Sequence, residues 1–76
     1  MTSTELIRML LKEFRASQTA LGRQLGYKSP GTISNRLRRD NMTVSTLLDT
    51  LEVFEYELVA RPVGSTDPTK DIILSK

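Results

Sequence analysis

Cationic side chains concentrate between residues 15 and 39 of this chain, a stretch without any acid. Its cations are Arg15, Arg23, Lys28, Arg36, Arg38 and Arg39, which give a local charge of +6. Serine, threonine, glutamine and asparagine lie among them and add hydrogen-bonding groups. Such a mixture favours binding of a polyanion such as nucleic acid. The other interpretation is a solvated cationic face without a partner.

Catalytic and metal chemistry find little support in the composition. The sequence has no cysteine and no histidine, which excludes disulfides, thiolate or imidazole metal sites, and nucleophile–histidine catalysis. The carboxylates Asp49, Glu52 and Glu55 fall on the predicted solvent face of a helix rather than in a pocket. We therefore expect no enzyme activity, no cofactor and no bound metal.

Charge is distributed unevenly although the net charge is only +2. Residues 40 to 76 carry a local charge of −4, opposite to the basic stretch before them. Because the basic stretch coincides with two short helical patterns, we expect the polyanion-facing surface and the second of these helices to be the same surface.

The first of these helices begins after Ser17, a good N-cap residue. Leu21 and Leu25 lie four residues apart on one face, and the helix is about two turns long. Gly26 then permits the left-handed conformation that ends a helix. Gly22 lies within this helix, where it either allows close approach of the second helix or is a tolerated weak position.

The second helix is predicted to begin at about Pro30, with Ser29 as its N-cap. When Ile33 points inward, Leu37 lies beside it, whereas Gly31, Asn35 and Arg38 fall on the opposite side and Thr32 and Arg39 on the flank. One face therefore packs and the other presents hydrogen-bond donors.

These positions resemble the helix-turn-helix of the phage repressor and Cro family, also called the xenobiotic-response-element (XRE) family. The matching residues are Gln18, Leu21, Gly22, Leu25, Gly26, Ile33 and Leu37. Gly22 replaces the usual alanine, and Ile33 and Leu37 come one or two places late, which indicates an extra residue in the turn. The resemblance covers about residues 5 to 54 and implies a mainly α, lambda-repressor-like core of four helices.

The flanking helices follow from capping and periodicity. Thr2 and Glu5 form a capping box for a helix over residues 3 to 14, and Thr43 caps a helix over residues 44 to 54. The apolar residues of the two helices recur at helical spacing and are expected in the core. They are Leu6, Ile7, Met9, Leu10, Leu11, Phe14, Val44, Leu47, Leu48, Leu51 and Phe54.

Two strands are predicted at the C-terminus, over residues 56 to 62 and 71 to 75, where they form an antiparallel hairpin. The chain then divides into a helix-turn-helix domain at residues 1 to 55 and a hairpin at residues 56 to 76. Its exposed apolar edge predicts a homodimer, since two-fold symmetry lets one edge meet itself. Folding back onto the helical core, or disorder of the last residues, is the alternative.

The resemblance implies contacts with double-stranded DNA. Gln18 would hold a phosphate, and Lys28, Ser29, Gly31, Thr32 and Asn35 would lie near base edges. Arg38 and Arg39 would lie mainly at phosphates, with Arg36 beside them. For each of these residues, ordinary surface solvation is the other interpretation.

The function expected from these patterns is a sequence-specific transcriptional regulator, a repressor that binds an inverted repeat as a homodimer. The alternative is a protein-binding module on the same scaffold, such as an antitoxin that binds its toxin through the C-terminal strands. With no long apolar run and no signal-peptide pattern, we expect a cytoplasmic protein without a membrane partner.

Overall fold

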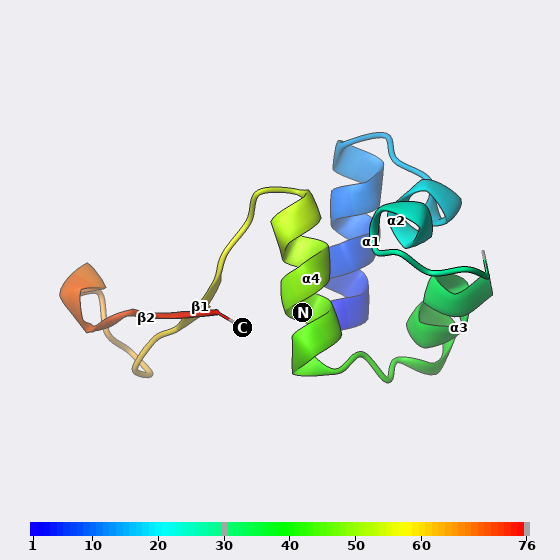
Figure 1. The fold of residues 1–76 in the computed structure, drawn as a ribbon. Helices are drawn as coiled ribbons and strands as arrows, with labels where there is room; N and C mark the ends of the chain where they lie inside the picture. The colour runs from blue at the N-terminus through cyan, green and yellow to red at the C-terminus, as the bar shows by residue number, and fades with distance from the viewer. Residues whose placement is uncertain (30, 76) are drawn as a thin grey trace.

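The computed structural model describes residues 1–29 and 31–75 and shows four α-helices followed by a small hairpin (Figure 1). The elements are α1 (Ser3–Glu13), α2 (Gln18–Gln24), α3 (Gly31–Arg39), α4 (Val44–Val53), β1 (Leu58–Ala60), the 3₁₀ turn η1 (Pro68–Lys70) and β2 (Ile72–Leu74). The helices pack together, and the hairpin projects from them, so the molecule measures 41 × 22 × 21 Å. The predicted class, mainly α with a C-terminal two-stranded antiparallel hairpin, is confirmed.

Side-chain caps begin α1, α2 and α4, as the sequence predicts. The hydroxyls of Thr2, Ser17 and Thr43 each accept from the backbone N–H three residues later, at 3.1, 3.0 and 3.1 Å. These three bonds satisfy N–H groups that a helix leaves without an internal partner and so fix where each helix begins. The Glu5 carboxylate accepts from the Thr2 hydroxyl at 3.2 Å and not from a backbone N–H, so the carboxylate half of the predicted capping box differs from the prediction.

All four helices contribute to one hydrophobic core. Its buried members are Ile7, Leu10, Leu11, Leu21, Ile33, Leu37, Leu51 and Phe54. A Cβ at Gly22 would lie 3.3 Å from Ile33 Cγ2, so the predicted close approach of α3 to α2 is confirmed. Thr50 is also fully buried, and its hydroxyl donates to the Thr46 carbonyl at 2.9 Å. That internal bond lets a polar residue occupy the core.

Three predicted core residues lie at the surface instead. Met9 is 44% exposed, Phe14 50% and Val44 58%. Phe14 packs on the rim of the core, where its ring centroid lies 5.1 Å from that of Phe54. A core this small covers only the narrow stripe of α1 around Leu10, so apolar residues at the margins of the helical pattern stay accessible.

The hairpin is shorter than predicted, because only three residues of each strand pair. Leu58 lies opposite Leu74, Val59 opposite Ile73 and Ala60 opposite Ile72. Beyond the paired residues, an ion pair joins Arg61 and Asp71. Arg61 Nε donates to Asp71 Oδ1 at 3.0 Å, and Nη2 donates to Oδ2 at 2.9 Å.

The hairpin stands away from the helices (Figure 1), so the predicted alternative in which it folds back onto the core is not observed. At the base of the hairpin, Leu58 packs against the helical core. Farther out, Val59, Ile72 and Ile73 are 40%, 66% and 57% exposed. Its apolar side chains are therefore free to contact another surface.

Candidate nucleic-acid interface

Helices α2 and α3 are joined by the turn that the sequence predicts. Gly26 follows α2 with φ of +81°, the left-handed conformation that glycine adopts without a steric penalty. The Ser29 hydroxyl accepts from the Gly31 N–H at 3.4 Å at the start of α3. The predicted first helical residue, Pro30, lies outside the described residues. Lys28 and Ser29 are exposed in this turn.

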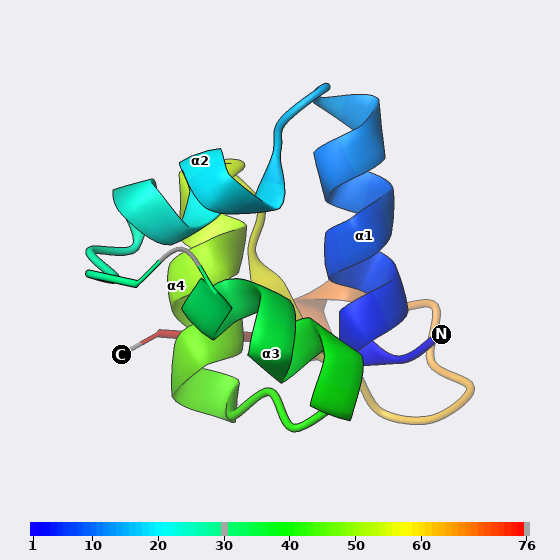
Figure 2. The same ribbon diagram turned by 90° about the vertical axis from the view of Figure 1, so that its right-hand side faces the viewer.

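Helix α3 has one buried face and one accessible face. Ile33 and Leu37 are 0% and 2% exposed, whereas Asn35, Arg38 and Arg39 lie at the surface. In Figure 2, α3 lies on the near side of the molecule and the hairpin lies behind α4. The donor face of α3 is therefore not covered by the C-terminal segment.

The two exposed residues in the middle of that face are linked. Arg38 Nη2 donates to Asn35 Oδ1 at 2.5 Å, so the arginine orients the asparagine amide. The Asn35 Nδ2 group stays available as a donor, and an amide oxygen has a second lone pair with which it can accept. The pair therefore presents both a donor and an acceptor beside a positive charge.

Gln18 is held against α3 from the start of α2. Its Oε1 atom accepts from the Ser34 hydroxyl at 2.6 Å. Because the carbonyl oxygen is engaged inside the protein, the Nε2 amide hydrogens are the part of Gln18 that suits an external acceptor. This bond joins residues 16 apart in the sequence, so helical periodicity does not predict it.

A polar hollow of about 280 Å³ lies along the C-terminal half of α3. Its lining residues are Thr32, Asn35, Arg36, Arg39 and Asn41. Arg36 is half-buried, and its Nε atom is shielded from water without a hydrogen-bond partner in the described part of the chain. A buried donor without an acceptor costs free energy, so the burial of Arg36 Nε is locally unfavourable.

The sequence did not single out Ser34 or Asn41 as site residues. Asn41 follows Asp40, which adopts a φ of +52° and whose carboxylate accepts from the Thr4 hydroxyl on α1. That contact fixes the C-terminal end of α3 and brings Asn41 beside the arginines. The sequence after Arg39 does not indicate that the chain changes direction at Asp40.

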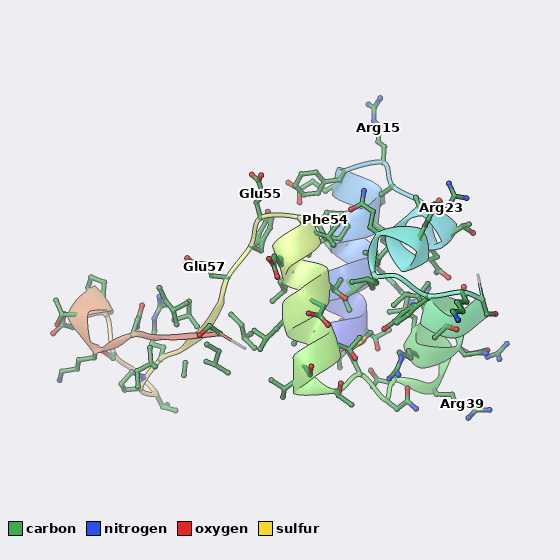
Figure 3. The ribbon with its side chains drawn as sticks, viewed as in Figure 1. Arg15, Arg23, Arg39, Phe54, Glu55 and Glu57 are labelled. Atoms are coloured by element: carbon green, nitrogen blue, oxygen red, sulfur yellow. The ribbon has the colours of Figure 1, made fainter. Side chains whose placement is uncertain are left out.

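The cations of the basic stretch do not form one surface. Figure 3 shows Arg23 and Arg39 on the side of α2 and α3, whereas Arg15 lies at the far end of α1. Arg15 is thus separated from the rest because the chain reverses there with a φ of +53°. Arg23 and Lys28 line a second hollow of about 330 Å³ with Thr19 and Tyr27, next to the turn.

Apart from Asp40, which directly follows α3, the acidic side chains of residues 40 to 75 lie on α4, in the hairpin or in the segment between them. Figure 3 places Glu55 and Glu57 where the chain leaves α4 for the hairpin, opposite to Arg39. Glu52 is exposed on α4 as well. The uneven charge along the sequence is therefore also a separation in space, which favours approach of a polyanion from the α3 side.

Within the described residues, three hairpin side chains have pKa values that differ clearly from their ordinary values. Hydrogen bonds from Arg61 lower the pKa of Asp71, and the same pair raises the pKa of Arg61. Hydrogen bonds from the Thr69 hydroxyl and backbone N–H lower the pKa of Asp67. Arg61 and Asp71 join the two strands, and Asp67 lies in the turn between them, so these shifts follow from hydrogen bonds within the hairpin.

Comparison with known proteins gives no relative for this chain, because no family model, curated protein or solved structure matches it. Among the described residues, none of the helices combines the length and apolar character needed to span a membrane. The functional assignment therefore depends on the geometry of α2 and α3.

Proposed function

We propose that this protein is a sequence-specific regulator of transcription, a repressor that binds double-stranded DNA as a homodimer. The observation that carries the proposal is the exposed Asn35–Arg38 pair on α3, whose opposite face packs in the core through Ile33 and Leu37. A rigid helix with donors on one side suits the major groove, which is wide enough to admit an α-helix.

Base recognition is assigned to the N-terminal half of α3 and the turn before it. Asn35 donates to N7 and accepts from N6 of an adenine, and Thr32 contacts a thymine methyl group. Lys28 and Ser29 reach neighbouring base edges, and Gly31 allows close approach. The Arg38 guanidinium, already hydrogen-bonded to Asn35, supports this orientation and neutralises phosphate charge.

Phosphate contacts hold the helix in register. The Gln18 amide donates to one phosphate from the start of α2. The hollow lined by Arg36 and Arg39 accommodates a second one, whose charge the two guanidinium groups neutralise. Such contacts add affinity for any sequence and make binding dependent on salt.

A single short helix reads few bases, since each good bidentate contact contributes only about 1 to 3 kcal/mol of discrimination. Two copies joined along the edges of their C-terminal strands place two α3 helices on the DNA and so double the number of bases that are read. An isolated two-stranded hairpin is marginally stable in water, so its exposed Val59 and Ile73 favour such pairing. The dimer binds an inverted repeat with half-sites about 34 Å apart.

Selection of bound sites from a random pool of duplexes tests this proposal. The expected result is an enriched inverted repeat whose half-site centres are separated by about one helical turn of DNA. Recovery of unrelated sequences at every salt concentration would contradict sequence-specific binding.

A second candidate function is a protein-binding module, such as an antitoxin that binds a toxin through the C-terminal strands. The exposed strand residues Val59, Ile72 and Ile73 favour it, because a free strand edge can extend the sheet of a partner. Both functions can coexist in one protein. Co-purification of a tightly bound second chain at fixed stoichiometry, together with failure to enrich any duplex, would favour this candidate.

A further inference from the structure

A groove of about 550 Å³ lies between α4 and the hairpin, on the opposite side of the molecule from α3. Its apolar lining residues are Leu48, Leu58, Ile73 and Leu74. Tyr56 and Ser75 also line it. A volume of this size suits a few side chains of a bound segment, since ligand pockets commonly measure about 300 to 1,000 Å³.

The charged residues of this groove are all acidic. Glu52, Glu55 and Glu57 line it and are exposed. Within residues 1–29 and 31–75, none of these three carboxylates has a cation at salt-bridge distance. Three unpaired acids beside an apolar surface attract cations and disfavour nucleic acid.

We propose that this groove binds a short segment of a partner protein that alternates apolar side chains with lysine or arginine. The apolar side chains contact Leu48 and Leu74, and the cations pair with Glu52 and Glu57. An extended segment suits the groove because its side chains point alternately to two sides, as in a strand.

A second copy of this chain is a poorer occupant. Self-association across the groove would bring Glu52, Glu55 and Glu57 of one copy close to the same acids of the other, which is unfavourable. The proposed homodimer instead joins strand edges and leaves the space between α4 and the hairpin open. Since α3 lies on the other side of the molecule (Figures 1 and 2), DNA and the partner segment bind together.

The test uses a labelled synthetic heptapeptide, Lys-Leu-Lys-Leu-Lys-Leu-Lys, titrated with the full-length protein by fluorescence anisotropy. The double variant Glu52→Gln/Glu57→Gln is expected to bind it about fivefold more weakly, as two exposed ion pairs are lost. The control Glu5→Gln/Glu13→Gln removes the same charge from α1 and should bind like the unchanged protein. Glutamine at residue 5 can still accept from the Thr2 hydroxyl, as Glu5 does.

Two further measurements separate groove binding from general attraction to an acidic surface. A peptide with serine in place of leucine should bind at least fivefold more weakly, and NMR shifts caused by the leucine peptide should centre on Leu48 and Leu74. Equal weakening in both double variants, equal binding of both peptides, or a dimer that blocks peptide binding would each overturn the proposal. None of these readouts requires that α3 bind DNA.

Discussion

The helical unit buries its apolar side chains in a core, whereas the hairpin leaves several of its apolar side chains exposed. In the helices, eight apolar side chains meet in one core, of which Ile33 and Leu10 are fully buried. In the hairpin, all six paired residues are apolar, yet Ile72 and Ile73 are more than half exposed. Strands that are apolar on both faces are typical of sheets that are covered on both sides. The helices thus complete their own core, whereas the hairpin leaves apolar side chains at the surface.

The largest expected effect tests the contrast in burial. Ile33→Ala should lower the free energy of unfolding by about 2 to 5 kcal/mol, because it opens a cavity between α2 and α3. Ile73→Ala should change it by less than about 0.5 kcal/mol in the monomer. Urea unfolding at low protein concentration measures both. An equal cost for the two variants would show that the hairpin belongs to the core.

Truncation before β2 tests whether the helices fold without the hairpin and whether the hairpin carries the dimer contact. A chain that ends at Arg61 should keep the helical signal in circular dichroism, because residues 1 to 54 contain the whole core. It should also associate at least tenfold more weakly in sedimentation equilibrium, since β2 is lost and β1 no longer forms part of a paired hairpin. A truncated chain that dimerises as strongly as the full-length protein would place the dimer interface on the helices.

Within α3, two substitutions should separate base reading from phosphate binding. Asn35→Ala should reduce discrimination between the selected site and a single-base variant by about 1 to 3 kcal/mol. Arg39→Ala should weaken binding to all duplexes alike and flatten the salt dependence. Competition titrations with both duplexes at several salt concentrations measure these effects. Identical behaviour of the two variants would contradict the assigned roles.

The smallest expected effect concerns pH and is confined to the hairpin. Arg61 lowers the pKa of Asp71, so the stabilisation from this pair is fully present above the ordinary aspartate pKa of about 3.9. It is lost as the pH falls through the lowered value. The NMR shift of the Ala60 methyl group should report a transition below pH ~3.9, which Asp71→Asn removes. A transition in the helices that Asp71→Asn also removes would argue against a separate hairpin.

Local sequence rules predicted the parts of the fold that depend on neighbouring residues. The caps at Thr2, Ser17 and Thr43, the turn at Gly26 and the inward pair on α3 all depend on groups within one or two helical turns. The strand pairing also followed from composition and from the turn between the strands. These features depend on residues close together in the chain, so they can be predicted from the sequence alone.

Features that depend on tertiary contacts could not be predicted in this way. The Gln18–Ser34 bond and the contact of Asp40 with Thr4 join distant segments. Exposure of Met9 and burial of Thr50 depend on how much of each helix its neighbours cover. The candidate site was therefore predicted as a set of residues, whereas its hydrogen bonds and the hollow beside Arg36 emerge only from packing.

The central claim is that the donor face of α3 binds duplex DNA, and salt dependence of binding tests it most directly. Titration of the selected duplex compares the unchanged protein with Arg38→Gln/Arg39→Gln and with the matched control Arg8→Gln/Lys12→Gln on α1. The α3 variant should lose about 0.9 in the slope of log K against log salt for each phosphate contact removed, while the control should keep its slope. Equal slopes for all three proteins, or an equal loss in both variants, would contradict this claim.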